Sequence, residues 1–188
     1  SDNRVWALQK DREGGIWVGT SAGVDRLDPA TGTFRHYTEL VQNKQVNWIS
    51  IDSENDIWIG AVDEVIIYDP NTEMVNRFSE HSRSFLEDSE KRYWIATLDN
   101  GIALYSKTDG PRKYLTERDG LANNQALCIL EDESENLWIS TSRGLSKYDP
   151  SRQLFRNFTS KDGLRNDQFN YGAAYRSKNG ELLFGGIT

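Results

Sequence analysis

Short apolar runs separated by polar turns recur along the whole chain, and this pattern is typical of β-strands. The clearest run, GIWVGT at residues 15–20, holds Trp17 within a strand of β-branched residues. The pattern returns with an aromatic residue at Trp58, Trp94, Trp138 and Phe184. These aromatic residues are separated by roughly 40 residues, which is the period of a β-propeller blade.

Each period holds four strand-like runs. In the first repeat they cover residues 5–9, 16–19, 24–27 and 33–37, and no helical pattern lies between them. The turn DPATG at residues 28–32 has proline to fix φ at its second position and glycine to accept a positive φ. Four antiparallel strands per repeat predict an all-β fold of β-propeller blades.

The repeats predict one partial β-propeller over residues 1–188. The expected blades cover about residues 5–37, 46–78, 84–115 and 126–158, and the start of a fifth covers 171–188. About four and a half blades would expose apolar end surfaces, because each repeat buries its faces only against its neighbours. We therefore expect further blades upstream in the natural protein, or self-association of two copies through their open ends. The sequence opens in mid-pattern, as an excised fragment would.

Two recurring residues are interpreted as structural. In the first repeat, Trp17 shares one side of its strand with Gly19, so we expect the recurring tryptophan to fill the wedge between neighbouring blades. Six residues before it stands an aspartate, whose carboxylate suits an Asx-type turn because it accepts backbone N–H groups. The aspartates are Asp11, Asp52, Asp88 and Asp132, and Lys178 takes their place in the fifth copy. One carboxylate per blade does not make an acid–base pair.

Composition and charge narrow the classes of function. The net charge is −7 and no basic stripe is present, so nucleic acid is not an expected partner. The single cysteine, Cys128, excludes an intrachain disulfide and is expected to be a small buried residue. No apolar stretch reaches the roughly 18 residues of a membrane helix. His36 and His81 have no Cys or His partner at ligand spacing, so neither a metal nor a cofactor is expected.

The two faces of such a propeller should differ in function. The turns that join the first strand to the second, and the third to the fourth, lie on one face, which we call the turn face. The loops that join the second strand to the third lie on the opposite face, and so do the crossovers between blades. We call this opposite face the loop face. The crossovers cover residues 38–45, 79–83, 116–125 and 159–168. Function is expected on the loop face, because its loops vary on a rigid scaffold.

Two crossovers share one phrase, DGLANNQ at residues 119–125 and DGLRNDQ at 162–168. Glycine permits a turn, leucine is expected to plug inward, and the asparagines lead toward the innermost strand. Each side-chain amide offers a donor and an acceptor, which suits an oligosaccharide. The alternative, which the pattern favours, is that Asn123 and Asn166 cap backbone groups of the crossover.

The candidate ligand-binding residues therefore belong to the loop face. Amides come from Asn123, Asn124 and Asn166, and an aromatic ring comes from Trp48, which breaks the repeat. Guanidinium groups would bind an anionic part of the ligand; the alternative is that they are solvent-exposed surface residues with no role in binding. These arginines are Arg83, Arg118, Arg143 and Arg165. No catalytic residue is expected.

The wording of the repeat resembles a known family. The stretch Asp11–Pro29 reads DREGGIWVGTSAGVDRLDP, and it is similar, like Asp119–Pro150, to the two-component regulator propeller repeat. The second and third copies depart from the pattern at Ala61, Glu64 and Ala96. The resemblance implies a periplasmic sensor propeller of a hybrid two-component histidine kinase or a related diguanylate cyclase. In the gut-bacterial members of that family the ligand is often a carbohydrate fragment. A β-sandwich, a membrane helix and the output domain usually follow the propeller in the family.

The expected function is a non-catalytic sensor domain within an inner-membrane signalling protein. Its partner would be an extracellular small molecule or an oligosaccharide. One alternative is a protein-interaction scaffold, which should show a large apolar patch on the loop face. The other is a propeller lyase or hydrolase, which needs a convergent cluster of histidine, glutamate or metal ligands.

Overall fold

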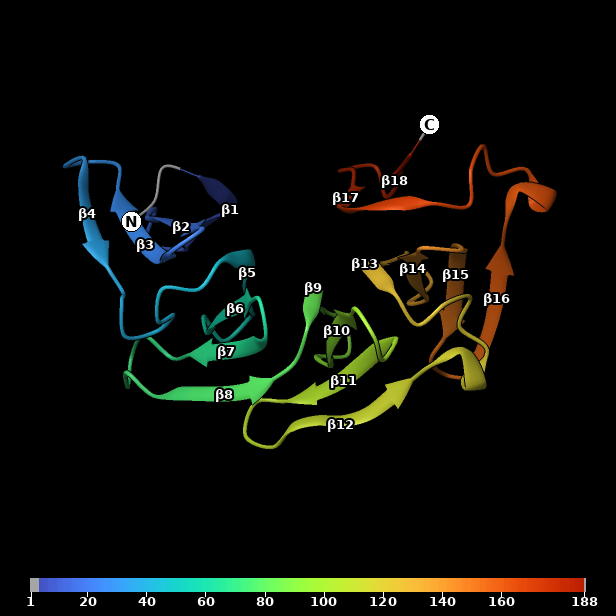
Figure 1. Ribbon diagram of the computed structural model, residues 1–188, viewed down its shortest axis with the longest axis horizontal. Coiled ribbons are helices and arrows are strands. Elements are labelled where there is room, and N and C mark those ends of the chain that lie inside the picture. The colour runs from blue at the N-terminus through green and yellow to red at the C-terminus, as the bar shows by residue number, and fades with distance from the viewer. Residues whose placement is uncertain (1–3, 188) are drawn as a thin grey trace. The chain divides into compact units, whose positions relative to one another are not determined.

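The computed structural model describes residues 4–187 and consists almost entirely of antiparallel β-sheet (Figure 1). Four sheets have four strands each, a fifth has two, and neighbouring strands in every sheet are consecutive in the chain. The predicted all-β fold of four-stranded propeller blades is confirmed. We number the sheets as blades 1–4 and half-blade 5.

The strands follow the repeat. Blade 1 contains β1 (Val5–Lys10), β2 (Ile16–Thr20), β3 (Gly23–Asp28) and β4 (Thr33–His36). Blade 2 contains β5 (Val46–Ile51), β6 (Ile57–Ala61), β7 (Glu64–Tyr68) and β8 (Val75–Ser79). Blade 3 contains β9 (Ser82–Glu87), β10 (Tyr93–Thr97), β11 (Ile102–Ser106) and β12 (Gly110–Leu115). Blade 4 contains β13 (Ala126–Glu131), β14 (Leu137–Thr141), β15 (Gly144–Asp149) and β16 (Leu154–Phe158). Half-blade 5 contains β17 (Phe169–Arg176) and β18 (Leu182–Gly186), and the 3-10 helices are η1 (Glu117–Asp119) and η2 (Ser160–Asp162).

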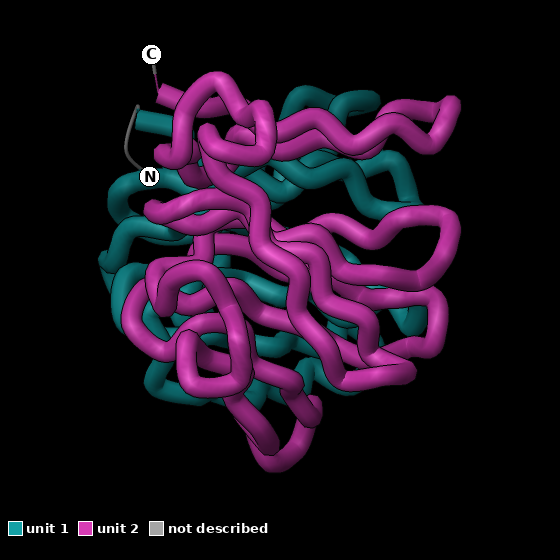
Figure 2. Tube along the Cα trace, turned by 90° about the vertical axis from the view of Figure 1, so that its right-hand side faces the viewer, with its two compact units in different colours: residues 1–82 teal, residues 83–188 magenta. Residues whose placement is uncertain are grey.

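The chain divides into two compact units, which Figure 2 colours separately. Residues 1–82 form unit 1, with blades 1 and 2, and residues 83–188 form unit 2, with blades 3 and 4 and half-blade 5. Each unit has its own apolar core and is described by itself. Among residues 4–187, no helix is long and apolar enough to cross a membrane.

Trp17 lies in the core of unit 1 among residues of blades 1 and 2. It is 2% exposed, and its ring centre lies 4.7 Å from that of Tyr37 and 6.2 Å from that of Tyr68. A Cβ atom on Gly19 would come within 2.6 Å of Val46, so this glycine lets β2 of blade 1 approach β5 of blade 2. The predicted wedge of tryptophan and glycine between blades is confirmed here.

Trp94 has the same place in unit 2. It is buried, and its ring centre lies 6.1 Å from that of Tyr148 in blade 4. A tyrosine at the third strand of the next blade therefore covers the tryptophan in both units. Trp138 is only half-buried and stacks on Phe158 of its own blade at 5.4 Å. Half-blade 5 has no third strand within the described residues to supply a covering tyrosine.

The recurring aspartates form the predicted Asx-type turns. Asp132 Oδ1 accepts hydrogen bonds from the backbone N–H groups of Ser134 and Asn136, both at 2.9 Å. The structure adds a contact that the sequence analysis missed, because Asp132 Oδ2 accepts the indole N–H of Trp138 at 2.8 Å. The same bond joins Asp52 to Trp58 and Asp88 to Trp94. The aspartate therefore holds both the turn and the tryptophan.

These contacts set the charge of Asp132. Burial works to raise its pKa, but hydrogen bonds from Trp138, Asn136 and Ser134 to the carboxylate lower the pKa to about 2. Lys147 Nζ adds an ion pair at 3.4 Å. Asp132 is therefore ionised at neutral pH, and its charge is used within blade 4.

Blade 1 departs from this rule. Asp11 Oδ2 accepts from Arg26 Nε at 2.6 Å, and the buried indole N–H of Trp17 has no hydrogen-bond partner. The backbone part of the turn persists, because Asp11 Oδ1 accepts from the N–H of Gly15 at 2.7 Å. Blade 1 thus keeps the Asx turn and exchanges the tryptophan contact for an ion pair.

The last hairpin corrects one sequence prediction. The N–H of Ser177 donates to the carbonyl of Glu181 at 2.8 Å, and the N–H of Glu181 donates to Ser177 Oγ at 3.0 Å. Ser177 therefore takes the place of the turn aspartate, and the assignment of Lys178 to that place was wrong. β17 begins at Phe169, ahead of the expected start at residue 171.

The register of half-blade 5 follows from this turn. β17 pairs Tyr175 with Leu183, just as β1 pairs Gln9 with Trp17. Leu183 therefore holds the tryptophan position, and the sequence alignment that put Phe184 there was wrong by one residue. Leu183 is 55% exposed, because half-blade 5 has neither a third strand nor a following blade within the described residues to cover this position.

Candidate functional site

The crossovers of unit 2 lie on its loop face, and each begins with a 3-10 helix. After blade 3, the N–H of Thr116 donates to Asp119 Oδ2 at 2.8 Å, and Gly120 ends the turn at a φ of 110°. Residues 159–163 repeat this arrangement after blade 4, with a glycine φ of 101°. The shared phrase therefore folds into the same turn twice, and the positive φ values explain its glycines.

The first crossover is fixed to blade 4 by Leu121. This leucine is 3% exposed and belongs to the core of unit 2, as the plug interpretation predicts. On either side of it, the carbonyl of Gly120 accepts from Asn157 Nδ2 at 2.9 Å, and the N–H of Ala122 donates to Ser146 Oγ at 3.0 Å. The loop that follows is therefore held by one apolar and two polar contacts.

Asn123 and Asn124 use most of their polar atoms inside the crossover. Asn123 Nδ2 donates to Glu117 Oε1 at 2.8 Å, and its Oδ1 accepts from the N–H of Gln125 at 3.1 Å and from Ser142 Oγ at 2.6 Å. Asn124 Oδ1 accepts from the N–H of Glu117 at 2.8 Å. These are the bonds of the capping interpretation, and they position the loop of blade 4 beside the crossover.

Asn123, Asn124 and Arg143 nevertheless meet around one hollow of about 330 Å³, which we call the polar hollow. Its remaining lining residues, which the sequence analysis did not single out, are Leu98, Asp99, Gln125 and Ser142. They come from the loops after β10 and β14 and from the crossover between β12 and β13. The signal that could have found them is their place in the chain, because these segments share the loop face.

Two polar side chains of this hollow remain available to a ligand. Arg143 and Gln125 are exposed, and their side chains form no hydrogen bond to the residues described. Arg143 still has a fixed backbone, because its N–H donates to Thr141 Oγ1 at 3.1 Å. The polar hollow thus offers a guanidinium and an amide on a constrained loop.

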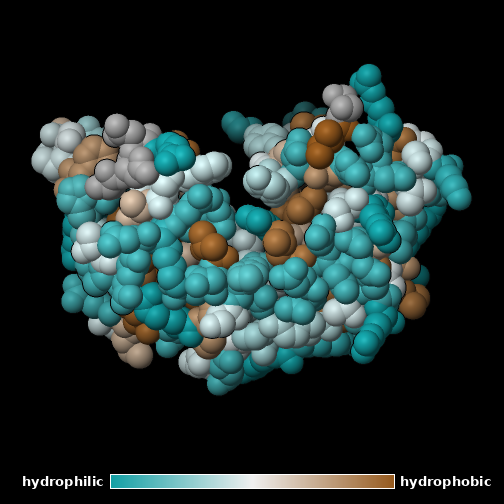
Figure 3. Space-filling model, in the orientation of Figure 1, coloured by the Kyte–Doolittle hydropathy of each residue, from teal (hydrophilic) through white to brown (hydrophobic). Residues whose placement is uncertain are grey.

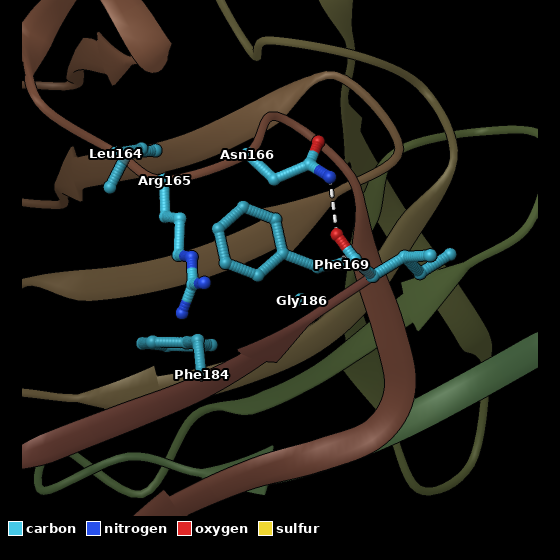
Figure 4. A pocket seen from close by; sticks show the side chains of 7 residues that line it. Leu164, Arg165, Asn166, Phe169, Phe184 and Gly186 are labelled. Atoms are coloured by element: carbon cyan, nitrogen blue, oxygen red, sulfur yellow. Dashed lines mark hydrogen bonds between the residues drawn. The ribbon is translucent and has the colours of Figure 1, made fainter.

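Arg165 and Asn166 belong to a second hollow of about 540 Å³, which we call the apolar hollow (Figure 4). Arg165 extends toward the rings of Phe169 and Phe184, which pack edge to face with their centres 6.3 Å apart. Asn166 Nδ2 donates to the carbonyl of Ile187. The other lining residues are Leu164 and Gly186. Leu164 is only half-buried, because half-blade 5 lacks, within the described residues, the third and fourth strands that cover Leu121 in blade 4.

The remaining candidates are separate from both hollows. Arg118 is exposed on η1, where only its backbone N–H is bonded, to Thr116 Oγ1. Arg83 lies on β9 with its guanidinium carbon 4.9 Å from the ring centre of Tyr171. In unit 1, Trp48 is half-buried and donates its indole N–H to Ser82 Oγ at 3.0 Å. Its ring lies against Gly60, where a Cβ atom would come within 2.0 Å of it, so Trp48 has a packing role.

Unit 1 also contains a histidine–carboxylate pair that the sequence analysis missed. His36 Nδ1 lies 2.7 Å from Oδ1 of Asp25, which is 4% exposed, and both line a hollow of about 330 Å³. Their register pair corresponds to Ser146 and Asn157 in blade 4, which anchor the crossover. The position therefore suits attachment of a crossover.

Cys128 is buried on β13 as predicted, and burial raises the pKa of its thiol.

Comparison with known proteins agrees with the repeat analysis. The family model for the two-component regulator propeller matches residues 1–22 and 120–143. A histidine kinase, P4, of Formosa agariphila is 24% identical over 98% of this chain. The match covers 15% of that kinase, so the chain corresponds to a small part of it.

Solved structures share the fold. The extracellular domain of a protein assigned as a hybrid two-component system from B. thetaiotaomicron is 28% identical, with a TM-score of 0.85 over 98% of this chain and 27% of that one. A second extracellular domain from the same bacterium, assigned to a one-component system, is 21% identical with a TM-score of 0.82, covering 98% and 28%.

Virginiamycin B lyase from Staphylococcus aureus has a TM-score of 0.79 at 13% identity, covering all of this chain and 64% of the lyase, which shows a shared fold alone. The match to the family model and the four-stranded sheets point the same way. Residues 1–22 and 120–143 therefore match the two-component regulator propeller repeat, within a fold of four-stranded propeller blades.

Proposed function

We propose that this chain is a non-catalytic sensor module of a two-component signalling protein, and that it binds its ligand on the loop face. The observation that carries the proposal is the polar hollow, where Gln125 of the crossover and Arg143 of the loop after β14 present unbonded polar side chains. Such a lining suits a small polar ligand such as an oligosaccharide. The similarity to an extracellular domain at 28% identity supports a periplasmic location.

Signal transmission is a further part of the proposal. The full-length protein would be anchored in the inner membrane, and ligand binding would change the relation between the propeller and a downstream kinase or cyclase. A ligand can shift such an equilibrium only by its difference in affinity for the two states. The crossover 116–125 is suited to this, because it joins blade 3 to blade 4 and its last three residues line the polar hollow.

The other two functions have less support. A protein-interaction scaffold should have an apolar loop face, whereas the polar hollow of unit 2 is lined mainly by polar side chains. A lyase or hydrolase needs a convergent cluster. The His36–Asp25 pair is the nearest approach to one, and its register position is that of a crossover anchor.

The proposal is tested by thermal-shift screening against a panel of neutral and acidic oligosaccharides, followed by calorimetry of each hit. A specific ligand raises the melting temperature by mass action. Arg143→Ala and Gln125→Ala should each weaken binding about tenfold, the effect of losing roughly one charge-assisted or neutral hydrogen bond. The matched control is Arg152→Ala, at the exposed turn after β15 on the opposite face. Equal losses in all three variants, or no hit in the panel, would overturn the proposal.

A further inference from the structure

The arginines of unit 2 are used differently on its two faces. On the turn face three arginines form ion pairs, Arg92 with Asp88 at 2.6 Å, Arg112 with Asp109 at 2.8 Å and Arg152 with Asp149 at 3.6 Å, whereas Arg176 has no ion pair with a described residue. On the loop face, Arg83, Arg118, Arg143 and Arg165 form no ion pair with any residue in the described range. Since the chain carries a net charge of −7, a set of unpaired cations on one face favours an anionic ligand there.

Arg83 stands at a position where the repeat is not constrained by packing. The first strand of a blade has a β-bulge, and the extra residue lies five positions before the turn aspartate. That residue is Trp6 in blade 1, Asn47 in blade 2 and Leu127 in blade 4, and the same spacing from Asp88 gives Arg83 in blade 3. Because every blade has a different residue there, blade packing does not determine its identity.

The guanidinium of Arg83 is poorly satisfied within the protein. Its Nε atom is buried and has no hydrogen-bond partner, which is rare for a buried donor. The guanidinium carbon lies 4.9 Å from the centre of the Tyr171 ring, a cation–π contact. Neither Nη atom of this half-buried side chain forms a hydrogen bond to a described residue, so its outer N–H donors are unused.

Tyr171 supplies the second half of a binding surface. It is 62% exposed, near the start of β17, and β9 and β17 are the first strands of their blades. Both side chains therefore stand at the ends of strands that leave the loop face. A guanidinium edge beside an exposed phenol ring offers two charge-assisted hydrogen bonds to a carboxylate and a flat surface for a sugar.

We infer that Arg83 and Tyr171 bind the carboxylate of an acidic sugar, a uronic acid unit of the oligosaccharide, with the carboxylate on the guanidinium and the pyranose ring against the tyrosine. This inference rests on the proposed function, because it names the class of ligand that the loop face binds. A planar guanidinium binds a carboxylate through two parallel N–H···O bonds, and an ammonium group does not reproduce this geometry.

Calorimetric titrations with trigalacturonate, galactotriose and acetate test the inference on the intact chain. Trigalacturonate should bind at least tenfold more tightly than galactotriose, and acetate should bind far more weakly than either. Arg83→Gln should reduce trigalacturonate affinity at least tenfold, Arg83→Lys should not restore it, and Tyr171→Ala should reduce the affinity for the trisaccharide. The matched control is Arg176→Gln at the far end of β17, which should leave affinity unchanged; circular dichroism verifies the fold of each variant.

The outcomes separate this inference from the proposed function. If galactotriose binds as tightly as trigalacturonate and depends on Arg143 but not on Arg83, the sensor proposal stands and the uronate site is overturned. If acetate competes as well as the trisaccharide, the sugar assignment is overturned. If Arg83→Gln and Arg176→Gln weaken binding equally, the effect is one of net charge and the site is overturned.

Discussion

The turn face and the loop face of unit 2 are made by the same strands, yet Asp132 on the first and Arg143 on the second differ in how their charges are used. On the turn face, Asp132 alone binds two backbone N–H groups, an indole N–H and Lys147. On the loop face, the guanidinium of Arg143 has no such partner among the described residues. Recurrence indicates that the bonded residues of the turn face are structural, because the turn aspartate is found in four blades. Function is therefore to be sought where the repeat varies and the polar groups remain unpaired.

The first crossover of the loop face is nevertheless fixed in place, because it is anchored to the apolar core of unit 2. Leu121 ties the crossover to the core, whereas Leu164, in the same phrase, is only half-buried. The same sequence motif thus forms a fixed loop beside a complete blade and a less firmly anchored loop beside half-blade 5. A free side chain is useful to a ligand only on the fixed loop, because less conformational entropy is lost on binding.

The largest expected effect comes from removing this apolar anchor. Leu121→Ala should lower the free energy of unfolding by about 3 kcal/mol, as for other buried leucines. Leu164→Ala, in the sister crossover, should cost less than about 1 kcal/mol because its side chain is half-exposed. Urea denaturation of both variants makes the comparison, and equal losses would show that the two crossovers are anchored alike.

A smaller effect should come from the charge of the turn face. The pKa of Asp132 is about 2 in the folded state and 3.8 when unperturbed, so its contacts stabilise the fold above pH 4. This contribution, roughly 2 kcal/mol at about 1.4 kcal/mol per pKa unit, is lost as pH falls from about 4 to 2. Asp132→Asn should therefore be less stable at pH 7, and its difference from the wild type should shrink over that range. Glu133→Gln, at the exposed neighbouring position, should not change the acid profile.

The sequence predicts those features of the fold that recur from one repeat to the next. The aligned copies predicted the strands, the wedge of Trp17 and the Asx turns, because these features recur in several blades. The bond from the aspartate to the tryptophan was also within reach, since the fifth copy lacks both residues at once. The register of half-blade 5 was missed because the apolar run LLFGG at 182–186 can be aligned either way, and only the Ser177 turn decides between them.

The site was harder to predict than the fold. The division into two faces placed Asn123, Asn124 and Arg143 on one side, and the structure brings these three to one hollow. The His36–Asp25 pair depends on strand register, and the Arg83–Tyr171 contact joins strands of blade 3 and half-blade 5. The residue spacing within one repeat does not predict either of these contacts.

A further prediction concerns the end of unit 2, where neither face is complete. Tyr175, Leu183 and Ile187 of half-blade 5 are 60%, 55% and 46% exposed, and Figure 3 shows apolar atoms at the surface near this end. An open strand edge with apolar residues favours pairing, so we expect self-association in size-exclusion chromatography. Leu183→Glu should weaken it, whereas Leu154→Glu, an equally exposed leucine on β16, should not. A wild-type chain that stays monomeric at all concentrations would contradict this.

The smallest effect should come from the free arginines. Replacing Arg118, Arg143 and Arg165 by alanine should change the free energy of unfolding by no more than about 0.5 kcal/mol each, as for surface residues without partners. Arg92→Ala on the turn face should cost more, because it leaves the carboxylate of Asp88 buried without its ion pair. Guanidinium chloride melts of the four variants give the ranking, and a reversed order would remove the contrast between the faces.

The most direct test of the account is a map of ligand contacts on the backbone, made by amide chemical-shift perturbation in NMR with the tightest-binding oligosaccharide. Perturbations are predicted at residues 98–99, 123–125 and 142–143, which line the polar hollow, with the turns at 88–92 and 149–153 unchanged. Perturbations confined to those turns would contradict the central claim that unpaired polar groups of the loop face form the sensor site.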